Sequence, residues 1–383
     1  MKPPAIDVEQ LSNRIRSLIA LEPSGGPIVS CYLAWSEQAS DLFEQRAALL
    51  HALASVGVDA LDQAIEAIRR YLATEILADT QGVVVYARGG SQPFLWPMQF
   101  QVPVPNHVSA NAIPDIYHLI ELKDTYDRYV VLIALEHRAR ILEINLGAIT
   151  REAWTEHPEL RDRVGEEWAH EHYQNHRHDR GRQFLDEKLR LLEKLMSAGG
   201  HTHLILAGDD QLTARVRDAL PSHLRAKLVD ILPLSANDDV ISATLASFID
   251  AEQRESRDAV AQLIAGLWRG GLAVAGTQRT IDALSRGRAD VLILASEYPS
   301  KSAWWCTACD WIDTLSGTPG RCSVCASTAL HRADRKELIV RLAERRGVEV
   351  EIVTGSEALL RVGGAGCLLR YTLDEWEPVA DAR

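Results

Sequence analysis

The sequence predicts a mixed α/β fold, in which strands and helices form α+β layers, divided into three domains. A chain of 383 residues is longer than a typical single domain. Short apolar segments with the pattern of buried strands alternate with segments whose apolar residues recur at helical spacing, which is typical of helices packed on sheets. Two Cys-x-x-Cys motifs in the last quarter indicate a zinc ribbon inserted in the third domain.

We expect the first domain to comprise residues 1–123. Its apolar spacing predicts a helix over Asp7–Ala20, a buried strand over Ile28–Trp35, a long helical region over Leu42–Leu77 and a second strand over Gly82–Arg88. The segment 91–123 then carries five prolines, Pro93, Pro97, Pro103, Pro105 and Pro114. This density predicts an extended connector that closes the domain.

The second domain, residues 124–255, opens with a hairpin pattern. Strands are predicted over Arg128–Leu135 and Ala139–Asn145, on either side of a polar turn. After a histidine-rich stretch, leucines at helical spacing predict a helix over Phe184–Met196, and His203–Ala207 has the pattern of a buried strand.

The third domain, residues 256–383, follows a charged helix predicted over Asp239–Gly266. Strands and helices alternate here as well, and the last two strands are placed to close a mixed sheet. The predicted elements are helices Thr277–Gly287 and Asp334–Arg346 and strands Asp290–Leu294, Val348–Val353 and Cys367–Tyr371.

The clearest chemical motif is formed by Cys306, Cys309, Cys322 and Cys325 within residues 305–330. Each Cys-x-x-Cys places two sulfurs on one turn, and two such turns complete a tetrahedral zinc site. The intervening segment holds Gly317, Pro319 and Gly320, which favour a chain reversal. A site with four thiolates is closed, so Zn2+ would have a structural role. A redox pair of motifs, or cysteines without metal, is the alternative.

Other features limit the class of protein. Cys31 and Cys367 lie alone in apolar strand-like segments, where we expect them to be buried and inert. The N-terminal sequence has no pattern of a secretory signal and no apolar segment is long enough to span a bilayer, so we expect a cytoplasmic protein without a membrane partner. A net charge of -12 restricts nucleic-acid binding to local basic patches, and no DNA partner is expected.

The histidine-rich segment 165–183 allows three hypotheses. It could be an arm that binds RNA, its arginines contacting phosphates and its aromatic rings stacking on unpaired bases. It could be a polar surface loop without a ligand. In the third hypothesis its histidines bind a metal for hydrolysis, although no acidic ligand set accompanies them. The candidate RNA-binding residues are Trp168, His170, His172, Tyr173, His176, Arg177, His178, Arg180 and Arg182.

A second basic cluster follows the ribbon on a predicted helix. Either its charges form a solvated face balanced by Glu337 and Glu344, or they contact RNA or a protein. The cluster consists of His331, Arg332, Arg335, Lys336, Arg341, Arg345 and Arg346.

The last third of the chain resembles the archaeal and eukaryotic peptide-chain release factors and Pelota. Residues 271–294, the four-cysteine ribbon and residues 348–371 occur in the order of that superfamily's third domain, and the ending Gly363–Tyr371 is similar. Residues 125–160 resemble the start of its second domain. The resemblance implies a three-domain architecture whose third domain engages a translational GTPase, and it includes a bacterial branch with ribosome-hibernation factors.

Two departures from the superfamily bear on activity. Release factors hydrolyse peptidyl-tRNA with a Gly-Gly-Gln loop, and this chain has only Gly181-Arg182-Gln183 as a distant counterpart. The arginine side chain would fill the space that a glycine leaves open. The chain also lacks the Asn-Ile-Lys-Ser type of decoding loop in its first domain. We therefore expect neither stop-codon reading nor release activity.

The resemblance, combined with the missing Gly-Gly-Gln tripeptide, implies a noncatalytic factor that occupies the A site of idle or stalled ribosomes. The expected partners are the ribosome with its rRNA and a translational GTPase such as elongation factor Tu. Two alternatives stay open: a peptidyl-tRNA hydrolase or RNA-cleaving rescue enzyme that uses the histidine-rich loop, and an adaptor that binds proteins away from the ribosome.

Overall fold

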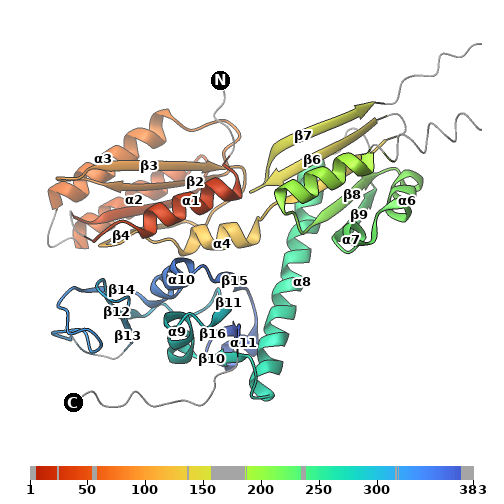
Figure 1. Ribbon diagram of the computed structural model, residues 1–383. Coiled ribbons are helices and arrows are strands. Elements are labelled where there is room, and N and C mark those ends of the chain that lie inside the picture. Colours follow the sequence, from red (N-terminus) through yellow and green to blue (C-terminus); the bar gives the residue numbers. More distant parts are fainter. Residues whose placement is uncertain are drawn as a thin grey trace, which may run out of the picture. The chain divides into compact units, whose positions relative to one another are not determined.

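The computed structural model describes residues 6–23, 26–53, 58–135, 138–156, 186, 188–233, 239–314, 317 and 319–371. The described residues form two compact units (Figure 1). One unit takes its residues from Met1–Val8 and Tyr126–Ala251, and the other from Glu9–Thr125 and Glu252–Arg383. The boundaries of the three expected domains stay predictions.

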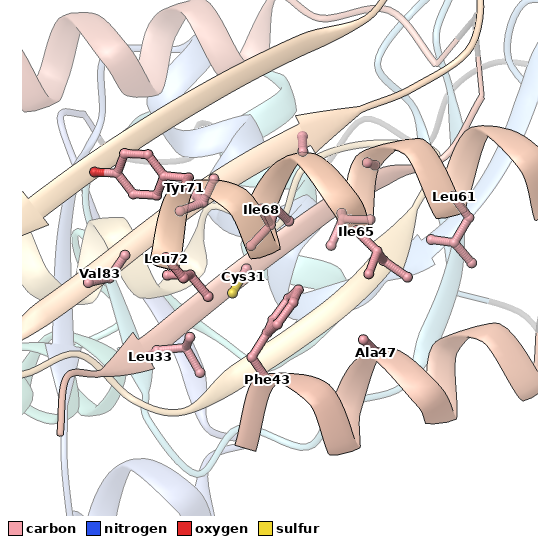
Figure 2. Packing of buried hydrophobic residues seen from close by; sticks show 14 residues of the cluster. Cys31, Leu33, Phe43, Ala47, Leu61, Ile65, Ile68, Tyr71, Leu72 and Val83 are labelled. Carbon is pink, nitrogen blue, oxygen red and sulfur yellow. The ribbon is translucent and has the colours of Figure 1, made fainter. Parts of the chain in front are cut away.

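An antiparallel sheet of order β3-β2-β1-β4 forms the N-terminal part of the larger unit. Its strands are β1 (Ile28–Ala34), β2 (Gly82–Arg88), β3 (Phe94–Phe100) and β4 (His107–Asn111). Figure 2 shows α2 (Ala39–Leu53) and α3 (Val58–Thr74) packed on one face of this sheet, with Phe43 and Ile68 directed at Cys31 and Leu33. Leu11, Ile15 and Leu18 form the buried stripe of α1 (Val8–Ile19). Burial of such residues supplies most of the stability of a domain.

The prediction of an extended connector over residues 91–123 is wrong. This segment contains β3, β4 and the start of α4 (Tyr117–Thr125). Pro97 lies inside β3, opposite Val85 of β2. Since β3 is the edge strand, the missing N–H of Pro97 breaks no hydrogen bond to a further strand, which is why the proline is tolerated there.

The smaller unit contains a sheet of order β7-β6-β5-β8-β9. The predicted hairpin is confirmed as β5 (Tyr129–Ala134) and β6 (Arg138–Asn145), while β8 pairs parallel with β5 and with β9. One face packs on helical residues 188–199 and on α6 and α7, and the other on Phe248 of α8. The remaining elements are β7 (Ala148–Glu156), β8 (Leu204–Gly208), α6 (Asp210–Ala219), α7 (Ser222–Arg225), β9 (Leu228–Pro233) and α8 (Val240–Trp268).

The C-terminal part of the larger unit holds a mixed sheet of order β10-β16-β11-β15, as predicted. β11 pairs parallel with β15 and antiparallel with β16. The mixed α/β class is therefore confirmed. The elements are β10 (Ala273–Ala275), α9 (Thr277–Ser285), β11 (Ala289–Ala295), α10 (Arg335–Arg345), β15 (Glu349–Val353), α11 (Glu357–Arg361) and β16 (Ala365–Leu369).

A separate three-stranded sheet of order β13-β12-β14 is inserted between β11 and α10. It consists of β12 (Ser302–Cys306), β13 (Ile312–Asp313) and β14 (Leu330–Asp334), and it carries the four cysteines. Among the helices of the described ranges, none has the length and apolarity that crossing a membrane requires.

Candidate metal centre

The four predicted zinc ligands converge at one end of the three-stranded sheet. All four Sγ atoms lie within 4.8 Å of one another. The pairs Cys306–Cys325 and Cys309–Cys322 are each 3.6 Å apart. A tetrahedral zinc ion with Zn–S bonds of about 2.3 Å sets its sulfurs about 3.8 Å apart. The four sulfurs are thus close enough together to bind one tetrahedral metal ion.

The two Cys-x-x-Cys turns share one backbone geometry. In each turn, the residue after the second cysteine has a positive φ: 59° for Asp310 and 58° for Ala326. Its N–H donates to the carbonyl of the first cysteine, at 2.9 Å for Asp310 and 3.0 Å for Ala326. A left-handed conformation costs an alanine about 1 kcal/mol, so the surrounding structure must enforce it at Ala326. Two copies of one turn, facing each other, are typical of zinc ribbons.

The thiols differ in acidity. Burial raises the pKa of Cys306, and that of Cys309 to about 12. Cys322 is also partly desolvated, but backbone N–H groups of Cys325 and Val324 point at its sulfur and hold its pKa at about 7. Metal binding must therefore displace protons, and the affinity for zinc falls as the pH is lowered.

The ribbon is attached to α10 through Trp305 and Asp310. Trp305 is 4% exposed, and the guanidinium groups of Arg341 and Arg345 lie 5.7 and 5.2 Å from its ring centre. Arg345 forms an ion pair with Asp310, the residue that completes the first cysteine turn. Trp305 Nε1 also donates to Asp310 Oδ1 at 3.3 Å. Trp305 therefore packs between the ribbon and α10.

A cavity of about 480 Å³ lies between the ribbon and the segment after α1. Its lining includes Trp305, His331 and Arg345 from the C-terminal part and residues 20–23 from the N-terminal part. Arg345 is already engaged, since it donates to Asp310 and to the carbonyl of Ile19. The Arg345 guanidinium therefore holds the ribbon and the N-terminal segment together at this cavity.

Two buried charges on α10 connect it to the N-terminal part of the same unit. Glu337 accepts hydrogen bonds from the N–H groups of Ile116, at 2.7 Å, and Tyr117, at 3.0 Å. Arg341 donates to the carbonyls of Ile19, at 2.9 Å, and Pro114, at 3.3 Å. The carboxylate lies at the positive end of the α4 dipole. For these two residues the hypothesis of a solvated helix face is wrong.

The start of α4 is also held from the N-terminal sheet. The hydroxyls of Tyr32 and Tyr86 donate to the carbonyl of Asp115 at 2.6 and 2.7 Å. The Asp115 carboxylate accepts from His107 Nε2 and Asn111 Nδ2, each at 3.0 Å. Two sets of hydrogen bonds therefore fix this turn, one from the sheet and one from Glu337.

Glu337 makes the stability of the contact between α10 and the start of α4 depend on pH. Burial, and then the Asp115 carboxylate, raise the pKa of Glu337 well above its ordinary value, while burial lowers that of Arg341 to about 10. The folded chain therefore retains a proton on Glu337 at a pH where the unfolded chain has released it. Stability is lost as the pH rises from the unfolded pKa of about 4.3 through the folded one.

The substitution Glu337→Gln is expected to remove this loss, because the amide does not titrate. The free energy of unfolding, measured from about pH 5 to about pH 8, should fall more steeply for the unmodified chain than for the variant. Glu349→Gln, at an exposed position, is the control. Parallel pH profiles for the chain and the Glu337 variant would contradict the assignment.

The lone cysteines are buried as expected, both at 0% exposure. Burial raises the pKa of both thiols, that of Cys367 to about 12. The histidine-rich loop 165–183, with the nine candidate RNA-binding residues, lies outside the described residues, so that prediction stands untested.

Residues 114–253 match the sequence model of the Bacterial archaeo-eukaryotic release factor family 10. For this central segment, the resemblance to the archaeal and eukaryotic release factors is confirmed. The match covers the central segment, including the predicted hairpin, and leaves the ribbon outside. No curated protein matches the sequence.

Several solved structures are similar over nearly the whole chain. An archaeal translation termination factor, aRF1, is 15% identical over 97% of this chain and 100% of its own, with a TM-score of 0.27. Pelota from Archaeoglobus fulgidus is 11% identical over 97% and 94%, with a TM-score of 0.36. A model of ribosome-bound archaeal Pelota and ABCE1 is 12% identical over 96% and 95%, with a TM-score of 0.40. Scores of this size establish no detailed correspondence.

Proposed function

We propose that the protein is a noncatalytic translation factor that binds the ribosome and occupies the A site of idle or stalled ribosomes. The observation that carries the proposal is the match of residues 114–253 to a bacterial release-factor family. The missing Gly-Gly-Gln tripeptide supports a role without peptidyl-tRNA hydrolysis. Within the superfamily, the chain resembles the bacterial hibernation factor Balon, and protection of idle ribosomes is the role we favour.

The proposed cofactor is one structural Zn2+ bound by Cys306, Cys309, Cys322 and Cys325. The convergence of the four sulfurs supports it. Because all four positions around the metal would be thiolates, no position is left for a reactive water. The metal would therefore fix the ribbon against α10 without taking part in chemistry.

The proposed partners are ribosomal RNA, a translational GTPase such as elongation factor Tu, and no membrane or DNA. Ribosomes and this GTPase are cytoplasmic, which is the location we propose. The arginines and aromatic residues of the loop 165–183 are suited to contacts with rRNA. The GTPase contact rests on the resemblance of residues 271–294 and 348–371 to the superfamily's third domain.

Sedimentation of cell lysates tests the proposal. The tagged full chain is expressed in growing, stationary and cold-shocked cells, and its distribution over a sucrose gradient is measured. We expect the protein in the ribosomal fractions of resting cells, and little of it on translating polysomes. A protein that remains in the ribosome-free fractions under all three conditions would rule out ribosome binding.

The enzyme alternative is tested with the ribosome-bound protein. Isolated ribosomes carrying labelled peptidyl-tRNA are incubated with the purified chain and with a variant in which His170, His172, His176 and His178 are replaced by alanine. We expect no release of peptide and no cleavage of RNA by either protein. Hydrolysis that requires these histidines would contradict the noncatalytic role.

A further inference from the structure

Three large apolar side chains are exposed at one end of the C-terminal sheet. Trp268, the last residue of α8, is 86% exposed, while Leu272 is 44% and Tyr371 is 52% exposed. An isolated exposed apolar residue is normal on a protein surface, but a group that includes a nearly bare indole marks a candidate binding surface.

The sheet topology explains why these residues meet. β10 and β11 both run antiparallel to β16, so the starts of the first two strands and the end of the third lie at the same end of the sheet. There, the N–H of Leu369 donates to the carbonyl of Leu272, and the N–H of Arg370 donates to that of Arg288, both at 3.0 Å. The C-terminus of α8 is tied to this end, because the N–H of Gly271 donates to the carbonyl of Gly266.

Three arginines lie at the same end of the sheet. Arg269 follows Trp268, Arg286 ends α9, and Arg288 precedes β11. Within the described part of the chain, these three side chains have no recorded ion pair or side-chain hydrogen bond, whereas Arg370 pairs with Asp290 at 3.2 Å. Arginine near a helix C-terminus is favoured by the helix dipole, which accounts for Arg269 and Arg286. The dipole does not account for the exposed indole beside them.

We propose that this end of the sheet binds RNA, with Trp268 stacking on an unpaired base and the three free arginines contacting phosphates. We name Trp268, Arg269, Leu272, Arg286, Arg288 and Tyr371 the aromatic–arginine surface. Base stacking on an aromatic side chain combined with arginine contacts to the backbone is how proteins bind single strands. Three arginines that form no ion pair with another described residue, on a protein of net charge -12, favour a polyanionic partner.

RNA fits the surface better than a protein does. Tryptophan, tyrosine and arginine also dominate protein interfaces, but there the core of the interface is depleted of charge. Here three arginines without an ion pair to another described residue lie at the same end of the sheet as the indole, which suits phosphates on either side of a stacked base. This inference rests on the proposed ribosome binding for the identity of the RNA, and places a contact on the third domain in addition to the loop 165–183.

Fluorescence anisotropy with the full chain and a labelled, unstructured RNA of about twelve nucleotides tests the surface. We expect Trp268→Ala to weaken binding of the single strand about tenfold, and binding of the same RNA as a duplex much less. The triple variant Arg269→Ala, Arg286→Ala, Arg288→Ala should lose three phosphate contacts. The slope of the logarithm of the RNA-binding constant against the logarithm of the salt concentration should therefore decrease in magnitude by about two.

Two matched controls keep the test specific. Arg279→Ala removes an exposed arginine from the opposite end of α9, and Leu360→Ala removes a residue that is 41% exposed at the opposite end of the sheet. Both variants should bind RNA like the unmodified chain. Equal affinity of the Trp268 variant and these controls would overturn the proposal.

Sedimentation with purified ribosomes separates this inference from the proposed function. If the unmodified chain binds ribosomes and Trp268→Ala binds both ribosomes and free RNA equally well, the surface is not an RNA site, although ribosome binding stands. If Trp268→Ala loses ribosomes but retains free RNA, the surface contacts a protein and the inference is wrong. If the unmodified chain binds free RNA through Trp268 but no ribosomes, the surface stands and the proposed function falls.

Discussion

Substituting Arg341 with alanine is expected to destabilise the larger unit by about 3 kcal/mol. The guanidinium of Arg341 is almost fully buried and donates to the carbonyls of Ile19 and Pro114. Without it, the Pro114 carbonyl loses this donor, the Ile19 carbonyl keeps only the longer bond from Arg345, and the Trp305 ring loses a neighbouring cation. Hydrogen exchange of the amide groups of α1 and α4 would measure the loss locally.

Arg346→Ala is the matched control, because Arg346 is exposed and ends the same helix. It should change the exchange free energies by less than about 0.5 kcal/mol. Equal effects of the two substitutions would show that α10 does not hold the N-terminal part of the unit in the way its hydrogen bonds indicate.

Removal of the metal is expected to loosen the ribbon without unfolding the chain. The cysteine site closes the small sheet formed by β12, β13 and β14, so this sheet depends on the metal more than the larger sheets do. The N-terminal sheet and the β10-β16-β11-β15 sheet both bury many apolar residues outside the ribbon. Chelation should therefore increase hydrogen exchange over residues 302–334 by orders of magnitude and leave β1, β2 and β11 protected.

Substitution of the cysteines tests the same metal site. Cys322→Ser should abolish binding of one zinc ion per chain, measured by metal analysis, whereas Cys31→Ala and Cys367→Ala should retain it because these cysteines lie in strands away from the ribbon. Global unfolding on chelation, or full zinc content in the Cys322 variant, would contradict the assignment of a closed structural site.

The sequence predicts those parts of the fold that depend on the spacing of residues close together along the chain. The hairpin of β5 and β6, the helix α10 and the four convergent cysteines each follow from short-range spacing. The pattern of the segment 91–123 predicts the wrong structure, because proline density indicates a loop unless the strand is known to lie at the edge of a sheet. Edge position depends on the pairing of distant segments and is not visible in the segment itself.

The role of α10 could not be predicted for a similar reason. Glu337 and Arg341 have the sequence pattern of a charged, solvated helix. Their partners are 220 and 322 residues away along the chain, at Tyr117 and Ile19. Only the tertiary fold brings each side chain to its partner, and residue spacing along the helix does not predict such a contact. The exposure of Trp268 also depends on the tertiary structure and could not be predicted, because a tryptophan at the end of an amphipathic helix is more often buried.

Competition with transfer RNA on purified ribosomes tests the central claim most directly. Binding of the labelled chain is measured on vacant ribosomes, on ribosomes with tRNA in the P site only, and on ribosomes with tRNA in both the P and A sites. A factor that occupies the A site should bind the first two populations and be excluded from the third. Equal binding to all three would contradict the proposed function.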